Sequence, residues 1–335
     1  MATKDIIVIG ASAGGVDALC RLCATLPADL PAAVFITQHL SPSARSVLPQ
    51  LIDRAGPLPA MSPVDGQAFE RGHIYVAGPD HHLLVREDKV LVRRGPYENR
   101  TRPAINALFR SAAIAYGGRV TGVVLTGLLD DGTDGLIAIK AAGGTSIVQD
   151  PADAQWPSMP RNAVKRDHVD RVVPLAEMGA LLAEVARQVA GPSVPLPGEY
   201  STEDLIAAQE FAVMETEIQT PGHTSPFSCP DCGGVLNQLE TGAELRFRCQ
   251  VGHAFTPLGL ADAQNGELER ALGIAVRTHR DRIRLFGQMA DSARERGLPH
   301  AVSRWEEASE ESQQMIAVLE KATNSLRKPP IDGEG

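Results

Sequence analysis

A serine at the end of an apolar run is the first feature of this sequence that could do chemistry. The run Ile6–Ile9 is β-branched and continuously apolar, as expected of a parallel strand that is buried on both faces. Gly10 and Gly14 flank Ser12 in a G-x-S-x-G arrangement, which allows a sharp turn from strand to helix that exposes a hydroxyl. The following helix would direct its first N–H groups at the same place. The sequence therefore predicts a nucleophile and part of an oxyanion site.

Two other interpretations of this turn are open. Gly10, Gly14 and Gly15 loosely resemble the glycine fingerprint of dinucleotide-binding Rossmann folds. That fingerprint needs a glycine where Ser12 stands and an acidic residue about 20 residues later for the ribose. The second predicted strand ends instead in His39, so nucleotide binding is the weaker interpretation. The other is a turn of small residues that carries no chemistry.

A histidine and three carboxylates follow at the ends of other predicted strands. Parallel strands joined by right-handed crossovers end at one edge of the sheet, so His39 would share a crevice with Ser12 and could act as a general base. A later apolar run leads into a loop that carries Asp130, Asp131 and Asp134. One of these could orient the imidazole, while another caps the next helix. Spacing alone does not say which one does so.

These residues belong to a pattern that resembles a known family. Residues 5–185 are similar to the catalytic domain of the CheB-type chemotaxis protein-glutamate methylesterases. The resemblance implies a Ser-His-Asp esterase on an α/β fold with a doubly wound, mainly parallel, Rossmann-like sheet. Its segments occur in the same order: Ile9–Gly15, Thr37–Leu40, Ile74–Ala77, Arg102–Ser111, Leu125–Gly127, Asp131–Gly132, Ala142–Gly144, Gln149–Asp150 and Met159–Arg161.

The resemblance assigns a role to each residue of the site. It implies that Ser12 is the nucleophile and His39 the base, with Asp131 as the orienting carboxylate. Asp130 and Asp134 are then left with capping or surface roles. The backbone N–H of Ala13 would hold the oxyanion, and catalysis would need no cofactor.

The reaction implied by the resemblance is hydrolysis of glutamate methyl esters on chemoreceptor proteins, in chemotactic adaptation. The family also deamidates some glutamines, which the same site would permit. Expected partners are methylated chemoreceptors and a chemotaxis kinase or adaptor complex. Two departures from the family pattern, Ala13 for threonine and Leu128 for methionine, support a second hypothesis. In that hypothesis the chain is a weak or inactive adaptor that binds receptors or signalling complexes.

Composition fits a protein of this class. A length of 335 residues suggests two or three domains, and a net charge of −9 argues against nucleic acid as the main partner. The sequence starts at the first strand of the esterase, so control by an attached receiver domain, which well-known members carry, is not expected. It shows no secretory signal and no apolar stretch of about 20 residues, so we expect a cytoplasmic protein that is not membrane-embedded.

A second group of reactive side chains lies in the C-terminal half. Cys229 and Cys232 form a C-x-x-C pair, and Cys249 and His253 follow as C-x-x-x-H, with short β-like runs between them. Three thiolates and one imidazole are typical of a closed tetrahedral Zn²⁺ site, in which four protein ligands leave no position for a substrate. A disulfide would leave one of the three cysteines unpaired. We therefore predict a structural zinc ion in a zinc-ribbon-like module.

The sequence divides into five segments. A capping box at Ser201–Asp204 predicts the start of a helix ahead of the zinc module. Periodic apolar residues among many charges predict a helical hairpin near the C-terminus, and we hypothesise that the C-terminal part regulates or targets the esterase. The segments are an esterase domain (1–190), a Pro-rich linker (191–200), a helix with the zinc-ribbon-like module (201–257), the helical hairpin (258–327) and a disordered tail (328–335).

Overall fold

The computed structural model describes residues 2–43, 46–166, 168–209, 222–241 and 244–326. The chain forms two units, residues 1–260 and residues 261–335, and each is considered by itself. The predicted tail at 328–335 lies outside the described residues.

A parallel sheet forms the centre of the first unit. Within the described residues it has seven strands in the order β3-β4-β2-β1-β7-β8-β9, and every neighbouring pair is parallel. Along β1 (Ile6–Ala11), Ile6 and Val8 join one hydrophobic cluster, whereas Ile7 and Ile9 join the other. This alternation is that of a strand covered on both faces. The remaining strands are β2 (Ala33–Gln38), β3 (Ala60–Met61), β4 (Ile74–Val76), β7 (Val120–Val124), β8 (Thr145–Gln149) and β9 (Arg171–Val173).

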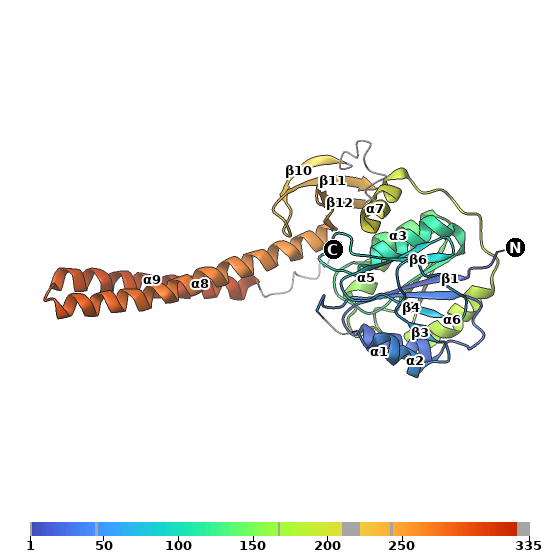
Figure 1. Ribbon diagram of the computed structural model, residues 1–335, viewed down its shortest axis with the longest axis horizontal. Coiled ribbons are helices and arrows are strands. Elements are labelled where there is room, and N and C mark those ends of the chain that lie inside the picture. The colour runs from blue at the N-terminus through green and yellow to red at the C-terminus, as the bar shows by residue number, and fades with distance from the viewer. Residues whose placement is uncertain (1, 44–45, 167, 210–221, 242–243, 327–335) are drawn as a thin grey trace. The chain divides into compact units, whose positions relative to one another are not determined.

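Helices cover both faces of this sheet, with α1 and α2 on one side and α3 on the other (Figure 1). The first side holds α1 (Gly15–Ala24), α2 (Leu48–Ala55) and α6 (Leu175–Arg187). The second holds α3 (Ile105–Tyr116), α4 (Thr133–Ala141) and α5 (Ser158–Arg166), together with the hairpin of β5 (His82–Arg86) and β6 (Lys89–Arg93). A short 3₁₀ turn, Gly117–Arg119, follows α3. The doubly wound α/β fold that the sequence predicts is confirmed.

A smaller antiparallel sheet completes the first unit. Its strand order is β10-β11-β12-β13, and α7 (Gly198–Ala208) precedes it. The predicted capping box is wrong, because α7 begins at Gly198 and Ser201 lies inside the helix. Glu203 and Asp204 are instead buried and paired with arginines, so they dock the helix rather than cap it. The strands are β10 (His223–Ser228), β11 (Val235–Thr241), β12 (Glu244–Cys249) and β13 (Ala254–Phe255).

Two long helices follow, α8 (Pro257–Glu295) and α9 (Pro299–Leu326), and they form the predicted hairpin. Phe286 and Trp305 stack across it with ring centroids 5.6 Å apart. Arg294 and Glu306 form an ion pair at 2.8 Å. Among the described residues, no helix is both long enough and apolar enough to span a bilayer.

Close packing of β1 against α3 sets the position of the helix N-terminus. A Cβ atom on Gly10 would lie 2.2 Å from Cγ2 of Ile105, the first residue of α3. Real Cβ contacts are essentially never this short, so the glycine lets the first turn of α3 lie directly on the end of β1.

Gly10→Ala should lower the free energy of unfolding by about 1–3 kcal/mol, because the added methyl group overpacks a filled core. Ile105→Ala removes the side chain that this methyl group would strike. The double variant should therefore be more stable than the sum of the two single losses predicts. Urea denaturation of the four proteins measures this coupling, and strictly additive losses would contradict the contact.

A buried histidine fixes the chain just before α3. His82 is fully buried, and its Nε2 lies 2.8 Å from the carbonyl oxygen of Pro96. Its Nδ1 accepts a hydrogen bond from the backbone N–H of Ala104, at 3.2 Å. The imidazole is therefore neutral, with its proton on Nε2, and burial lowers its pKa below 6.5.

His82 should make the stability of the fold depend on pH. As the pH falls below 6.5 the unfolded chain binds a proton that the buried imidazole resists, so the free energy of unfolding falls. This loss should develop as the pH falls from about 7.5 to about 5.5, and each pKa unit of difference between the folded and unfolded states corresponds to about 1.4 kcal/mol. His82→Gln keeps an N–H for Pro96 but cannot titrate, so its loss over that range should be smaller. Equal pH dependence in urea denaturation of the two proteins would refute a neutral His82.

Candidate active site

The serine lies in a tight turn between β1 and α1. Gly14, the N-cap of α1, has a φ of 73°, a conformation that glycine adopts without strain. The N–H of Ser12 donates to the carbonyl oxygen of Thr126 at 3.0 Å. The carbonyl oxygen of Ser12 accepts a hydrogen bond from the side chain of Gln38 at 2.8 Å. These bonds fix the backbone of the turn and leave the hydroxyl at the carboxyl edge of the sheet.

The histidine follows β2, the strand beside β1. The N–H of His39 donates to the carbonyl oxygen of Ala11 at 3.1 Å, which continues the pairing of the two strands. Its Nδ1 lies 3.1 Å from Oγ of Ser12. Its Nε2 lies 2.7 Å from Oδ2 of Asp131. The structure therefore places Ser12, His39 and Asp131 together, as expected for residues at the carboxyl ends of parallel strands.

The carboxylate of Asp131 is held by the N-terminus of α3. Oδ2 accepts the N–H of Ile105 at 2.7 Å, and Oδ1 accepts the N–H of Asn106 at 3.3 Å. No side chain within α3 caps this end, so a residue distant in sequence supplies the acceptor that its free N–H groups need. The first turn of α3 and the imidazole of His39 together hold the carboxylate in place.

The other two carboxylates of the loop point elsewhere. Asp130 bonds to Arg166 at 2.7 Å and to the hydroxyl of Thr256 at 2.8 Å. Asp134 contacts Arg246 at 3.1 Å. Both are buried, and burial, reinforced by the charge of Asp134, raises the pKa of Asp130 to about 6. The predicted capping or surface roles for these two residues are therefore wrong, because Gly132 is the N-cap of α4 and both carboxylates are ion-paired.

An available backbone donor lies beside the serine. Among the hydrogen bonds of the described residues, the N–H of Gly15 is used by the Ser12 carbonyl and that of Gly127 by the Trp156 carbonyl, whereas none uses the N–H of Ala13. The carbonyl oxygen of Ser12 belongs to the same peptide unit as this N–H, and it accepts from the side chain of Gln38 at 2.8 Å, which orients the unit. The N–H of Ala13 is thus free to meet a developing negative charge.

Sequence reasoning missed the residue that ties the Asp131 loop to α3. Oδ1 of Asn106 accepts the N–H groups of Gly132 and Gly135, at 3.0 and 2.8 Å. Gly132 has a φ of 95°. An asparagine in the first turn of a helix gives no local sign of this role, because its partners lie in a distant loop.

The three cysteines and the histidine predicted to bind metal lie together. Their ligand atoms are all within 4.8 Å of one another. Nδ1 of His253 lies 3.6 Å from Sγ of Cys229 and of Cys249, and the Sγ atoms of Cys232 and Cys249 are 3.7 Å apart. With Zn–S bonds of about 2.3 Å and Zn–N bonds of about 2.0–2.1 Å, the edges of a tetrahedron are close to these lengths. The cluster can therefore hold a tetrahedral metal ion.

Comparison with known proteins finds a family model and relatives that match the first half of the chain. The family model described as CheB methylesterase matches residues 7–182. A Methanosarcina mazei protein named protein-glutamate methylesterase/protein-glutamine glutaminase 2 is 38% identical over 192 residues, which are 55% of this chain and 52% of that protein. A Caulobacter vibrioides protein of the same name is 37% identical over 191 residues, 56% of this chain and 55% of that one. The chain thus spans about half the length of these curated relatives.

Two further matches cover nearly the whole of the other protein. A relative from Leptospira interrogans is 34% identical over 178 residues, which are 53% of this chain and 92% of the relative. The crystal structure of the CheB methylesterase catalytic domain of Thermotoga maritima matches with a TM-score of 0.52 and 30% identity, covering 55% of this chain and 99% of that one. The chain belongs to the CheB methylesterase family.

Proposed function

We propose that the chain hydrolyses glutamate methyl esters on chemoreceptor proteins, with Ser12 as nucleophile, His39 as base and Asp131 as the orienting carboxylate. The observation that carries this proposal is the hydrogen-bond chain from Ser12 Oγ to His39 at 3.1 Å and from His39 to Asp131 at 2.7 Å. A hydroxyl, an imidazole and a carboxylate in this order are the parts of a serine acyl-transfer site. The relatives' name, protein-glutamate methylesterase, supplies the class of ester.

The reaction follows from these contacts. Nδ1 of His39 takes the hydroxyl proton of Ser12 while Oγ attacks the ester carbonyl carbon, and Asp131 stabilises the resulting imidazolium. The carbonyl oxygen becomes an oxyanion that the N–H of Ala13 binds. One such donor is typically worth about 3 kcal/mol of barrier. Methanol leaves with the proton from His39. A water molecule then attacks the acyl-enzyme while His39 takes its proton, and His39 returns that proton to Oγ of Ser12 as the carboxylate of the glutamate side chain is released.

The same steps would convert glutamine to glutamate, with ammonia in place of methanol as leaving group. We propose methylated chemoreceptors as the substrates, a chemotaxis kinase or adaptor complex as a further partner, and adaptation as the role. The three free thiols of the metal-binding cluster are those of a reducing compartment, so we propose that the protein acts in the cytoplasm.

Ser12→Ala should reduce methanol release from a methylated chemoreceptor by on the order of 10⁴-fold or more, because no other group can form the acyl-enzyme. Ser201→Ala, at an exposed serine on α7, is the matched control and should retain wild-type activity. Methanol release and labelling by a fluorophosphonate, with circular dichroism to verify folding, are the measurements.

Labelling of the wild type that persists in Ser12→Ala would contradict Ser12 as nucleophile. A folded wild type that neither labels nor releases methanol would instead favour the adaptor hypothesis, for which the exposed Leu128 is the supporting observation.

We further propose that Cys229, Cys232, Cys249 and His253 bind one structural Zn²⁺ ion. The proposal is supported by the tetrahedral spacing of the ligand atoms and by two tight turns that present them. In the first turn the N–H of Cys229 bonds to the carbonyl of Gly234, and in the second the N–H of Cys249 bonds to that of His253. Four protein ligands complete the coordination, so the ion would stabilise the small sheet and take no part in the ester chemistry.

The purified protein should contain about one zinc ion per chain, as measured by elemental analysis. Cys249→Ser should lose most of this metal and lower the melting temperature, because binding of a structural zinc ion contributes directly to folding. Cys20→Ser changes a cysteine on α1 outside the cluster and should keep the full metal content. Equal zinc content in the two variants would argue against the cluster as the ligand set.

A further inference from the structure

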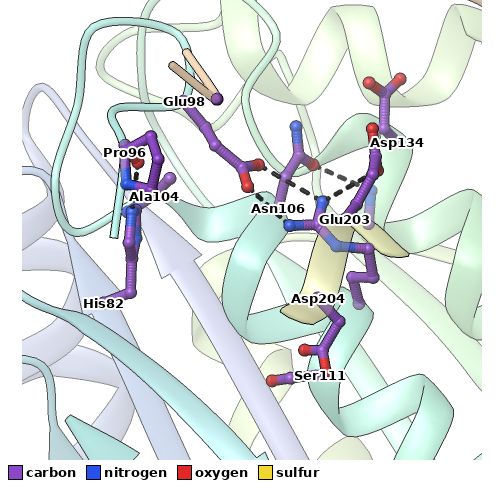
Figure 2. A network of polar contacts seen from close by, with 12 residues as sticks. His82, Pro96, Glu98, Ala104, Asn106, Ser111, Asp134, Glu203 and Asp204 are labelled. Carbon is purple, nitrogen blue, oxygen red and sulfur yellow. Dashed lines mark hydrogen bonds and ion pairs between the residues drawn. The ribbon is translucent and has the colours of Figure 1, made fainter. Parts of the chain in front are cut away.

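A buried ionic cluster joins the small antiparallel sheet to the esterase. Figure 2 shows three of its carboxylates, Glu98, Asp134 and Glu203. Arg110 on α3 bonds to Glu98 at 2.6 and 3.3 Å. Glu203 on α7 meets Arg110 at 3.3 Å and Arg246 at 2.5 Å. The ionic cluster has four acidic and four basic side chains: Glu98, Asp130, Asp134, Glu203, Arg110, Arg166, Arg246 and Arg248.

Both parts of the first unit are needed to balance these charges. β12 supplies Arg246 and Arg248, which contact carboxylates of the esterase and of α7. Burial by itself would raise the pKa of Glu98, but Arg110 and Arg248 outweigh it and hold the pKa well below its ordinary range. A buried charge that loses its partner is strongly destabilised. The ionic cluster therefore favours one placement of the small sheet on the esterase.

Main-chain bonds continue this junction toward the catalytic loop. The N–H of Ala254 on β13 donates to the carbonyl of Tyr97 at 3.1 Å, and the N–H of Asn99 donates to the carbonyl of Ala254 at 2.8 Å. The side chain of Asn99 then accepts the N–H of Thr256 at 2.9 Å. Asn99 has a φ of 49°, a conformation that asparagine tolerates better than most residues.

Thr256 reaches the loop that carries the catalytic carboxylate. Its hydroxyl donates to Oδ1 of Asp130 at 2.8 Å, and Arg166 holds the other oxygen of Asp130 at 2.7 Å. Asp131 is the next residue. The side chain of Asp130 is therefore clamped between the esterase and the end of the small sheet, immediately before the residue that bonds to His39.

We propose that the small sheet and its metal-binding turns act as a positioning element for Asp131, through the contacts of Thr256 with Asp130 and with Asn99. This inference rests on the proposed function, because it assigns to the junction the task of holding Asp131 against His39. Thr256 and Asn99 do not touch the reacting atoms, so they are positioning residues. Their loss slows the attack of Ser12 without removing any catalytic group.

The metal-binding turn lies within the same junction. Arg248 of the ionic cluster immediately precedes Cys249, and Ala254 immediately follows His253. Arg248 also donates to the carbonyl oxygen of Gly252, at 2.7 Å, between these two ligands. A metal ion on Cys249 and His253 would close this turn and hold both the arginine and β13.

The test is the rate at which a fluorophosphonate labels the full-length protein, together with the fraction of chains that label at completion. Thr256→Val keeps the shape of the side chain but removes its hydroxyl, whereas Thr256→Ser keeps the hydroxyl. Displacing a catalytic group by about 1 Å can cost on the order of 100-fold, so we expect labelling to slow about tenfold in Thr256→Val. Thr256→Ser should restore the rate. The labelled fraction should stay unchanged.

Asn99→Gly provides an independent second variant, because glycine accepts the positive φ but lacks the acceptor for Thr256. Asn99→Asp retains that acceptor and is its control. Asn99→Gly should slow labelling as Thr256→Val does, and Asn99→Asp should not. With a methylated receptor as substrate, both slow variants should lower kcat and leave KM unchanged, since Asp131 acts on the transition state.

The outcomes separate this inference from the proposed function. Wild-type labelling rates in both Thr256→Val and Asn99→Gly would overturn the positioning role while leaving the esterase proposal intact. A reduced labelled fraction with an unchanged rate per labelled chain would also overturn it, because that result indicates only a loss of folded protein. Failure of the wild type itself to label would contradict the proposed function, and the inference would fail with it.

Discussion

The site depends on one interaction, the binding of the Asp131 carboxylate at the N-terminus of α3. The first N–H groups of a helix need acceptors, and here the carboxylate that holds His39 is that acceptor. A single group therefore caps the first turn of a helix and bonds to the imidazole of His39. The arrangement requires α3 to start directly against β1, which Gly10 allows because it has no side chain. The close packing of the start of α3 on β1 is thus required both by the fold and by the position of Asp131.

Much of this arrangement follows from topology that a sequence can reveal. Apolar runs predict parallel strands, and parallel strands end at one edge of a sheet, so the amino-acid sequence alone predicts that Ser12 and His39 lie together. The choice among the three carboxylates could not be made from spacing. Loop conformation decides it, because Leu129 with a φ of 61° and Gly132 with a φ of 95° direct neighbouring side chains to different partners.

The cluster of three cysteines and His253 and the capping box show how far a local sequence pattern predicts structure. The cysteine turns are local, since each pair of ligands lies within one short loop, and their pattern is legible in the sequence. Glu203 and Asp204 also form a recognisable local pattern, but their partners Arg246 and Arg86 are distant in the chain. The long-range pairing of buried charges, and not a local tendency to cap a helix, therefore determines the contacts of these two residues. Such pairing leaves no periodic signal that a sequence could show.

The ionic cluster is better explained as fixing the orientation of the small sheet on the esterase than as adding to the stability of the fold. The buried side chains of the ionic cluster lose hydration that their mutual attraction only partly restores, and an apolar interface of the same size would hold the small sheet on the esterase at least as well. An apolar interface, however, tolerates sliding, whereas paired charges and hydrogen bonds admit one register. Asp130 lies at the edge of the ionic cluster and precedes Asp131. A junction that fixes register therefore also limits the movement of the loop that carries Asp131, which an equally stable but looser contact would not do.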